Sequence, residues 1–366
     1  MYVPEDVLID ILTYVDKADL PAICRVNKTY REYAADNLYR EISFRFGTLP
    51  RAAVCRTLID SPQLAARVRR FEVGGVTKTN DEAMHLLADT LQHLPSLRAL
   101  DLTADNYIQN RDHKAWVLRN CTFKLKTFCT SFCFNSNLMN FLVSQTELES
   151  VTLHSHPIII GLYPFEPSAL SKLGRVSVTS MSWLRILIPG RPIYDVEVHD
   201  VNIGSRSYHS FDLSLLSLST RPILRLTLPI HVLRRTSICQ VATTLPSLEE
   251  LTVTSNANST HAIEWPHVLE WLASLLSNLH ELRDVSVVNG NLRFPGFDEK
   301  EMESMLEILD HSKSLEYFTM TSVVSTKTWK RVGGEWVTST ADSERHNLWV
   351  QEMAQKFRHS PSLWNL

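Results

Sequence analysis

Two short stretches contain residue types that could bind a metal ion or a phosphate group. His154-Ser155-His156 offers two imidazoles, which are common metal ligands, and Gly74-Gly75-Val76-Thr77-Lys78 has the composition of a phosphate-binding loop. The histidines have no acidic or cysteine partner at ligand spacing, and the glycines and lysine do not form a Walker pattern. We therefore interpret the histidines as a surface pair, and we expect neither a metal nor a cofactor.

Serine, histidine and aspartate are frequent enough that a catalytic triad could assemble from distant parts of the chain. However, the sequence contains no nucleophile elbow, dinucleotide fingerprint or zinc motif. The six cysteines form no CxxC pair and lie in apolar sequence, as buried thiols of a reducing compartment do. The sequence favours a non-enzyme located in the cytoplasm or nucleus, with a hydrolase of unrecognised site as an alternative.

The composition is that of a folded protein and does not favour nucleic acid or a membrane as a partner. The chain has 366 residues, of which 44% are hydrophobic and 21% charged, as in folded proteins with a large core. A formal net charge of −3 provides no general attraction to nucleic acid or to an anionic membrane. No apolar run is long enough to span a membrane, and the N-terminus lacks the pattern of a signal peptide.

The first element expected to present a surface is a helix that begins near Pro4. Proline is tolerated in a first turn, and Glu5 and Asp6 place negative charge near the positive end of the helix dipole. One apolar stripe at helical spacing is expected from Leu8, Ile11, Leu12 and Val15.

Two further short helices are expected. Asp19 is a candidate N-cap for the second, which has Leu20, Ile23 and Cys24 on its apolar face, and a third contains Tyr30 and Tyr33. Three short helices bury little surface by themselves, and some apolar residues lie outside the stripes. Either the rest of the chain or a partner protein must cover that second face, and composition does not decide between them.

The segment 1–45 resembles an F-box. It has Val3-Pro4 where the family has Leu-Pro, Lys28-Thr29-Tyr30 where the family usually has a basic pair and tryptophan, and Leu38-Tyr39 in place of Leu-Trp. In that family the motif docks on a Skp-type adaptor, which links it to a cullin. The resemblance implies that the adaptor-facing residues are Val3, Pro4, Ile9, Leu12, Leu20, Ile23, Val26 and Tyr30. Ile9 and Val26 lie off the helical stripes, so we expect them to be the most exposed of this set.

The remaining sequence repeats a loose Leu-x-x-Leu-x-Leu frame. We expect strands at Val68/Phe71/Val73, Leu97/Leu100/Leu102, Leu125/Phe128/Thr130, Leu148/Val151/Leu153, Leu173/Val176/Val178, Ile193/Val196/Val198, Ile223/Leu226/Leu228, Leu248/Leu251/Val253, Leu282/Val285/Val287 and Leu315/Phe318/Met320. Such a frame recurs by chance, so its flanks matter more: residues 94–103 parallel residues 245–254, and helix-like leucine patterns precede several frames.

A helix, a short turn and a strand at intervals of 20 to 34 residues resemble a degenerate leucine-rich repeat. We therefore predict an α/β fold, in which a three-helix F-box precedes an irregular leucine-rich-repeat solenoid with a parallel sheet on one face. The expected divisions are 1–45 (F-box), 46–67 (linker helix), 68–322 (repeats), 323–342 (β-hairpin insertion) and 343–366 (last helix and truncated repeat).

Strand alternation predicts which residues face away from the helices. The expected outward column is Glu72, Asp101, Cys129, Thr152, Ser177, Glu197, Thr227, Thr252, Ser286 and Thr319. This column is either a simply solvated sheet face or a ligand-binding concave surface. We place substrate recognition in its C-terminal half, at Glu250, Thr252, Thr254, Asp284, Ser286, Tyr317, Thr319, Trp329 and Trp336.

The hairpin is expected to turn at Gly333-Gly334, since glycine adopts the positive φ that a type I′ turn needs. In that register Arg331 faces Trp336, and Trp329 lies diagonally on the same side. This hairpin resembles one that is a feature of F-box proteins common in fungi. The two tryptophans either contact a substrate or close the end of the solenoid.

These observations support two main hypotheses. The first is the substrate-recognition subunit of a Skp–cullin–F-box ubiquitin ligase, which binds a protein substrate through its repeats. The alternative is a non-ligase repeat scaffold whose first helices cap its hydrophobic end.

Overall fold

The computed structural model describes most of the chain in two compact units, residues 1–150 and 151–366. The described residues are 4–45, 49–75, 81–103, 114–155, 165–166, 168–199, 212–233, 238–255, 265–289, 299–310, 312–322 and 326–338. Predictions for Val3, for His156 and for the last helix at 343–366 lie outside these residues.

Three helices open the first unit: α1 (Glu5–Thr13), α2 (Leu20–Ile23) and α3 (Lys28–Arg40). They enclose a small core of their own, in which Leu8, Leu12, Leu20 and Ala34 are buried. Helix α3 begins where Asn27 Oδ1 accepts a hydrogen bond from the backbone N–H of Tyr30, 2.9 Å away. Asp19 occupies the N-cap position of α2 but makes no side-chain cap bond there.

Strand β1 (Glu41–Arg45) follows α3 without an intervening loop and pairs in parallel with β2 (Arg70–Gly74). The sequence frames begin at Val68 and did not predict this strand. The rings of Phe44 and Phe71 pack edge to face at 5.6 Å, which joins β1 to the apolar side of the sheet. The first strand of the sheet therefore belongs to the segment expected to form the F-box.

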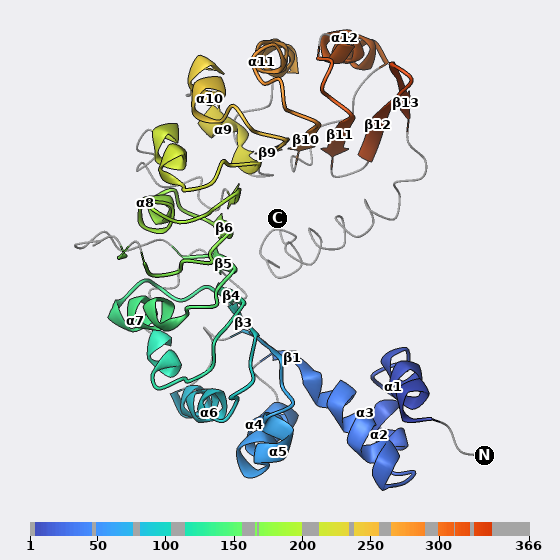
Figure 1. Ribbon diagram of the computed structural model, residues 1–366, viewed down its shortest axis with the longest axis vertical. Helices are drawn as coiled ribbons and strands as arrows, with labels where there is room; N and C mark the ends of the chain where they lie inside the picture. Colours follow the sequence, from blue (N-terminus) through green and yellow to red (C-terminus); the bar gives the residue numbers. More distant parts are fainter. Residues whose placement is uncertain are drawn as a thin grey trace. The chain divides into compact units, whose positions relative to one another are not determined.

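The rest of the first unit alternates helices and parallel strands. Its elements are α4 (Leu49–Asp60), α5 (Pro62–Ala65), β2, α6 (Asp81–Gln92), β3 (Ala99–Thr103), η2 (Lys114–Leu118), β4 (Thr127–Thr130) and α7 (Ser136–Ser144). Strands β1 to β4 are neighbours in chain order, and α4, α6 and α7 cover one side of them (Figure 1).

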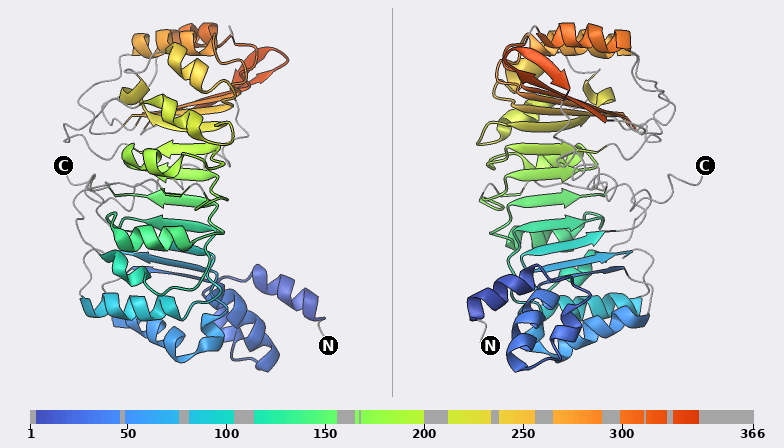
Figure 2. Two further views of the ribbon diagram at one scale, coloured as in Figure 1. Left: turned by 60° about the vertical axis from the view of Figure 1, so that its left-hand side comes forward. Right: turned by 90° about the vertical axis from the view of Figure 1, so that its right-hand side faces the viewer.

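The second unit repeats this alternation. Its elements are β5 (Ser150–Leu153, at the unit boundary), β6 (Arg175–Val178), α8 (Ser182–Leu187), β7 (Asp195–Val198), η3 (Leu213–Leu218), β8 (Arg225–Pro229), α9 (Ile230–Leu233), α10 (Ile238–Thr244), β9 (Glu250–Ser255), α11 (Trp265–Leu276), β10 (Asp284–Asn289), α12 (Glu299–Asp310), β11 (Tyr317–Ser322), β12 (Thr326–Val332) and β13 (Glu335–Thr338). Within this unit, strand order again follows chain order, and β6 to β11 are parallel, as two further views show (Figure 2).

All ten predicted frames are strands, β2 to β11, so the predicted α/β fold with a mainly parallel sheet is confirmed. The physical reason is burial on the helix side: in β9, for example, Leu251 and Val253 are almost fully buried, while Thr252 and Thr254 between them are partly exposed. The resemblance to leucine-rich repeats stays a prediction.

The hairpin extends the sheet instead of standing apart from it. Strand β12 pairs antiparallel with β11 on one side and with β13 on the other. The turn between β12 and β13 contains Gly333 and Gly334, whose φ angles are 64° and 95°. Arg331 faces Trp336 as predicted, with the guanidinium carbon 5.6 Å from the ring centroid.

Candidate functional site

Helix α1 and the turn after α2 present several apolar side chains to solvent. Ile9 is 42% and Val26 is 65% exposed, as expected from their positions off the helical stripes. A second group was not expected: Val7, Ile11 and Tyr14 are 43%, 51% and 90% exposed, and their i, i+4, i+7 spacing places them along one side of α1. That spacing was visible in the sequence, but Ile11 was assigned to the inner stripe.

Two residues expected to face an adaptor lie inside the small core instead. Leu12 and Leu20 are each only 2% exposed, because they pack with Leu8 and Ala34 between the three helices. Ile23 and Tyr30 are partly buried against the same core. Leu12 and Leu20 can therefore affect docking only by holding α1 and α2 in place.

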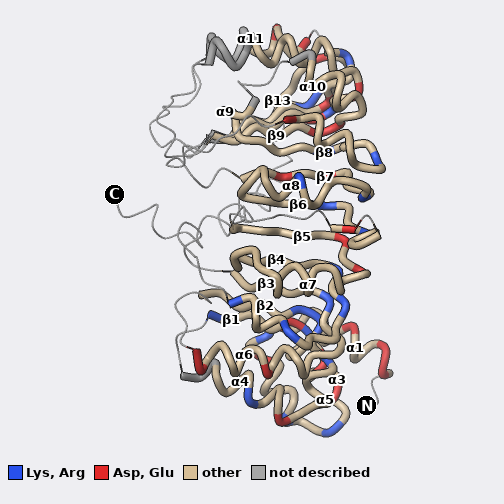
Figure 3. Tube along the Cα trace, turned by 90° about the vertical axis from the view of Figure 1, so that its left-hand side faces the viewer, with Lys and Arg blue, Asp and Glu red and all other residues tan. Residues whose placement is uncertain are grey.

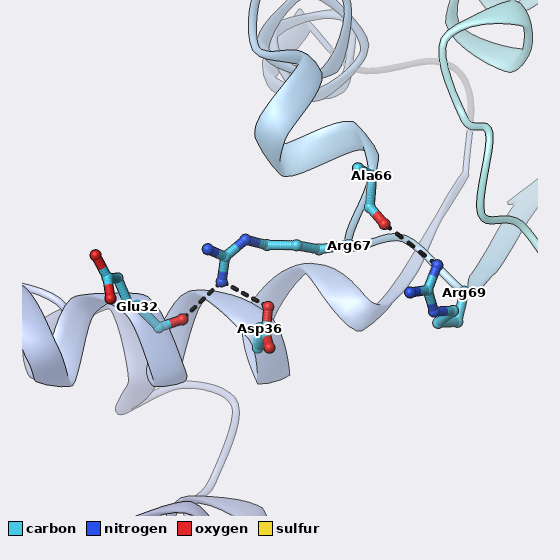
Figure 4. Close-up of polar contacts among 5 residues, drawn as sticks. All are labelled: Glu32, Asp36, Ala66, Arg67 and Arg69. Atoms are coloured by element: carbon cyan, nitrogen blue, oxygen red, sulfur yellow. Dashed lines mark hydrogen bonds and ion pairs between the residues drawn. The ribbon is translucent and has the colours of Figure 1, made fainter.

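A salt bridge fixes α3 to the turn that follows α5. Arg67 Nη1 donates to the carboxylate of Asp36 at 2.5 Å and to the backbone carbonyl of Glu32 at 2.6 Å (Figure 4). Nearby, Arg69 Nη1 donates to the carbonyl of Ala66 at 3.2 Å. Lys17 Nζ also donates to the carbonyl of Glu41 at 2.6 Å, which ties the loop after α1 to the start of β1. The three helices are thus held to the sheet of the first unit by several polar contacts.

The outward column predicted from the sequence is present in each unit. In the first, Glu72, Asp101 and Cys129 are opposite one another on neighbouring strands. In the second, the same pairing joins Ser177, Glu197, Thr227, Thr252, Ser286, Thr319 and Thr328. In each unit, we call the side of the sheet that bears this column the open face.

Most residues proposed to contact a substrate share the open face of the second unit. Glu250, Asp284 and Tyr317 form one row across β9, β10 and β11, and Thr252, Ser286 and Thr319 form the next. Thr254 lies one step further along β9. All seven are exposed or partly exposed, so the structure brings them together on one surface.

The two hairpin tryptophans lie on the other side of the sheet. Trp329 is opposite the buried Phe318, its ring lies 5.9 Å from the phenyl ring, and it is only 2% exposed. Trp336 donates from Nε1 to the carboxylate of Asp310 at the end of α12, at 2.9 Å. Trp329 therefore cannot act as an exposed anchor, and its position agrees with the alternative expectation that it closes the end of the predicted solenoid.

Ser177, Glu197 and His199 bring a hydroxyl, a carboxylate and an imidazole together in the second unit. Ser177 Oγ lies 2.8 Å and Glu197 Oε1 lies 3.3 Å from the same atom, His199 Nε2. In a catalytic triad the carboxylate binds the opposite ring nitrogen, which leaves one nitrogen to accept the proton of the nucleophile. Here both groups compete for one nitrogen, so this cluster lacks the geometry that activates serine.

Asp101 is a largely buried carboxylate on the open face of the first unit. Its Oδ1 is buried without a hydrogen-bond partner among the described residues. Burial raises the pKa of Asp101 to about 6, and the negative charge of Glu72 on the neighbouring strand adds to this effect.

The described residues contain no group of three or more histidine, cysteine or acidic side chains arranged to hold a metal ion. Among the helices that the structure describes, none has the length and apolarity required to cross a membrane.

A comparison with known protein families identifies the segment that contains the first three helices. The F-box-like family model matches residues 2–45, the segment that contains α1 to α3 and β1. A comparison with curated proteins finds no significant match. Residues 2–45 of this chain are therefore an F-box-like domain, followed by an α/β fold with a mostly parallel sheet.

Proposed function

We propose that this protein is the substrate-recognition subunit of a Skp–cullin–F-box ubiquitin ligase. The F-box-like domain would dock on a Skp-type adaptor, and through it on a cullin, while the open face of the repeats binds a protein substrate. The observation that supports this most directly is the exposure of apolar side chains within the F-box-like domain: Ile9 and Ile11 on two sides of α1, and Val26 in the turn after α2.

The proposed mechanism is proximity, so the subunit needs no catalytic residue. A substrate held on the same particle as a ubiquitin-charged conjugating enzyme presents its lysines at a raised effective concentration. The direct passage from α3 into β1 supports this role, because it leaves no flexible linker between the adaptor-docking helices and the sheet of the first unit. This function places the protein in the cytoplasm or nucleus.

The alternative scaffold role, in which the first helices only cap the repeats, is less consistent with their packing. The pairing of β1 with β2 and the contact between Phe44 and Phe71 already cover the start of the sheet. Helices α1 and α2 pack instead into a separate core with α3. A role as a cap alone would not explain why Val26 and the apolar side chains on the outer side of α1 are exposed to solvent.

Binding of the full chain to a purified Skp-type adaptor tests the proposal. Ile9→Asp and Val26→Asp each introduce a charge into the exposed apolar surface, so we expect affinity to fall by roughly thirtyfold or more with little change in melting temperature. Ile11→Asp examines the other side of α1. Point variants are preferred because deletion of residues 1–45 would also remove β1.

Val332→Asp is the matched control, because Val332 is 54% exposed but lies in the hairpin of the second unit. It should bind the adaptor like the unaltered chain. No binding by the unaltered chain, or full binding by Ile9→Asp and Val26→Asp, would contradict the proposed docking.

A further inference from the structure

Three arginines converge on one tyrosine ring where strands β6, β7 and β8 begin. The guanidinium carbons of Arg175, Arg221 and Arg225 lie 6.0, 5.9 and 5.6 Å from the centroid of Tyr194. Arg175 Nε also donates to the Tyr194 hydroxyl at 3.2 Å. These residues come from the starts of β6 and β8 and from the segments just before β7 and β8. We call this group the Tyr194 arginine cluster.

Local packing fixes the position of the ring. A Cβ atom at Gly174 would lie 2.5 Å from Cε1 of Tyr194, so the ring occupies space that only glycine leaves open. The Gly174 carbonyl also accepts from the backbone N–H groups of Tyr194 and Asp195, at 3.0 and 3.2 Å. Tyr194 is thus a platform held against the backbone, and the arginines pack around it by cation–π contacts.

Positive charge exceeds negative charge in the cluster. Asp195 lies 3.7 Å from Arg175 and 3.1 Å from Arg225, whereas Arg221 contacts the Tyr194 ring and not this carboxylate. The cluster therefore has three guanidinium groups and one carboxylate. Arg221 is exposed, and its guanidinium has no ion-pair partner among the described residues. A phosphate monoester, which has close to two negative charges and three acceptor oxygens at neutral pH, complements this excess.

The next strands bear the opposite charge. In the strand register, Glu250 of β9 lies opposite Arg225 of β8, and Asp284 of β10 lies opposite Glu250. Arg175, Asp195, Arg225, Glu250 and Asp284 are the first residues of their strands. Figure 3 colours the basic residues of this unit blue and its acidic residues red. A long polyanion such as nucleic acid would meet the two carboxylates and be repelled, whereas a peptide with one phosphate and a nearby basic residue would fit both regions.

We propose that the Tyr194 arginine cluster binds a phosphorylated side chain of a protein partner, with a basic residue of the same segment on Glu250 and Asp284. The interpretation of this partner as a ligase substrate rests on the proposed function, but binding of the phosphorylated segment does not require the adaptor. Arg221 would provide the guanidinium that is free to approach the phosphate, and Tyr194 would hold the cluster in place.

The test uses the full chain without adaptor and a pool of short peptides with randomised residues around a fixed phosphoserine. The same pool without phosphate is the reference, and inorganic phosphate is the competitor. We expect the phosphorylated pool to be retained at least about tenfold better, with lysine and arginine enriched near the phosphoserine. Arg221→Ala and Arg225→Ala should each weaken binding of a selected peptide by about tenfold at unchanged melting temperature.

Arg283→Ala is the matched control, since Arg283 is an exposed arginine directly before β10 in the same unit and outside the cluster. It should leave peptide binding unchanged. Equal retention of the two pools, or an equal effect of Arg221→Ala and Arg283→Ala, would overturn the proposal. Competition by inorganic phosphate as effective as that of the peptide would overturn the assignment to a protein partner. A failed adaptor-binding experiment would not affect these measurements.

Discussion

The guanidinium of Arg67 lies 2.5 Å from the carboxylate of Asp36 and joins the turn after α5 to helix α3. The side chains are 28% and 63% exposed, so the ion pair itself contributes little to global stability. Arg67 also donates to the Glu32 carbonyl, which Asp36→Asn leaves intact. The contact therefore acts locally, on the attachment of α3 to the sheet of the first unit.

We expect Arg67→Ala to lower the free energy of unfolding by about 1 kcal/mol or less, because the pair is exposed. Amide hydrogen exchange should nevertheless become faster in α3, and more so than in Asp36→Asn. Lys126→Ala is the control, since Lys126 forms a similar exposed pair with Glu149 in the same unit, at 2.9 Å. Exchange in α3 that responds equally to both alanine variants would contradict a local role of Arg67.

Arg191 is a buried cation surrounded by backbone carbonyls. It donates to the carbonyls of residues 186, 187 and 189 at the end of α8, and to those of residues 165, 166 and 169. Arg191→Met would leave these acceptors unpaired, so we expect a loss of roughly 2–4 kcal/mol in thermal or denaturant unfolding. Arg191→Lys should recover only part of it, since one ammonium has three donors.

Arg185→Met is the control, because Arg185 is an exposed arginine on α8 itself. It should change stability by less than about 0.5 kcal/mol. If Arg191→Met were as mild as Arg185→Met, the carbonyls would have to find other donors.

Asp101 makes stability depend on pH. Because burial raises its folded pKa to about 6, above the ordinary value of 3.8, the folded state holds a proton that the unfolded state releases between these values. The contribution of Asp101 to stability therefore falls as pH rises from about 4 to about 6, and the full penalty persists above that range. Asp101→Asn should stabilise the protein by on the order of 2 kcal/mol at pH 7, but not at pH 4.

Denaturant melts at both pH values measure this difference, and Asp89→Asn on the exposed side of α6 is the control. A gain in Asp101→Asn that is the same at pH 4 and pH 7 would show that ionisation of Asp101 is not its source.

The tryptophans of the hairpin should differ sharply in their effects on stability. Trp329→Ala removes a buried ring packed on Phe318 and should cost roughly 3–5 kcal/mol. Trp336→Ala removes a cation–π contact with Arg331 and a hydrogen bond to Asp310, and should cost about 1 kcal/mol. Substrate capture that is lost in Trp329→Ala at an unchanged melting temperature would instead support direct recognition.

The strands were predictable because burial on one side leaves a regular trace in the sequence. Leu251 and Val253 face the helices, Thr252 does not, and the same alternation marks each of the ten frames. Strand β1 was missed because Ile42 and Phe44 lie on an edge strand and are only partly buried. Trp329 was misplaced because the hairpin register alone does not say which of its sides faces the helices.

The Tyr194 arginine cluster had no signal in the sequence. Its members are far apart along the chain, and only strand pairing brings Arg175, Asp195 and Arg225 into one row. The core of the F-box-like domain was partly predictable from the helical stripe: Leu8 is buried, but Ile11 on the same stripe is exposed. Leu12 is buried as the stripe implies, not exposed to an adaptor as the family resemblance implied. Helical spacing identifies a stripe but not its width.

The direct passage from α3 into β1 also means that the length of one helix sets a rotational phase. Each residue inserted into an α-helix turns everything before it by about 100° and advances it by 1.5 Å. One extra residue in α3 would thus rotate the exposed apolar side chains of α1 and of the turn after α2 by about 100° relative to β1. Seven extra residues, close to two turns, would nearly restore the original orientation, with these side chains about 10 Å further from β1. The lengths of α3 that keep the original orientation of α1 and α2 therefore recur about once per helical turn.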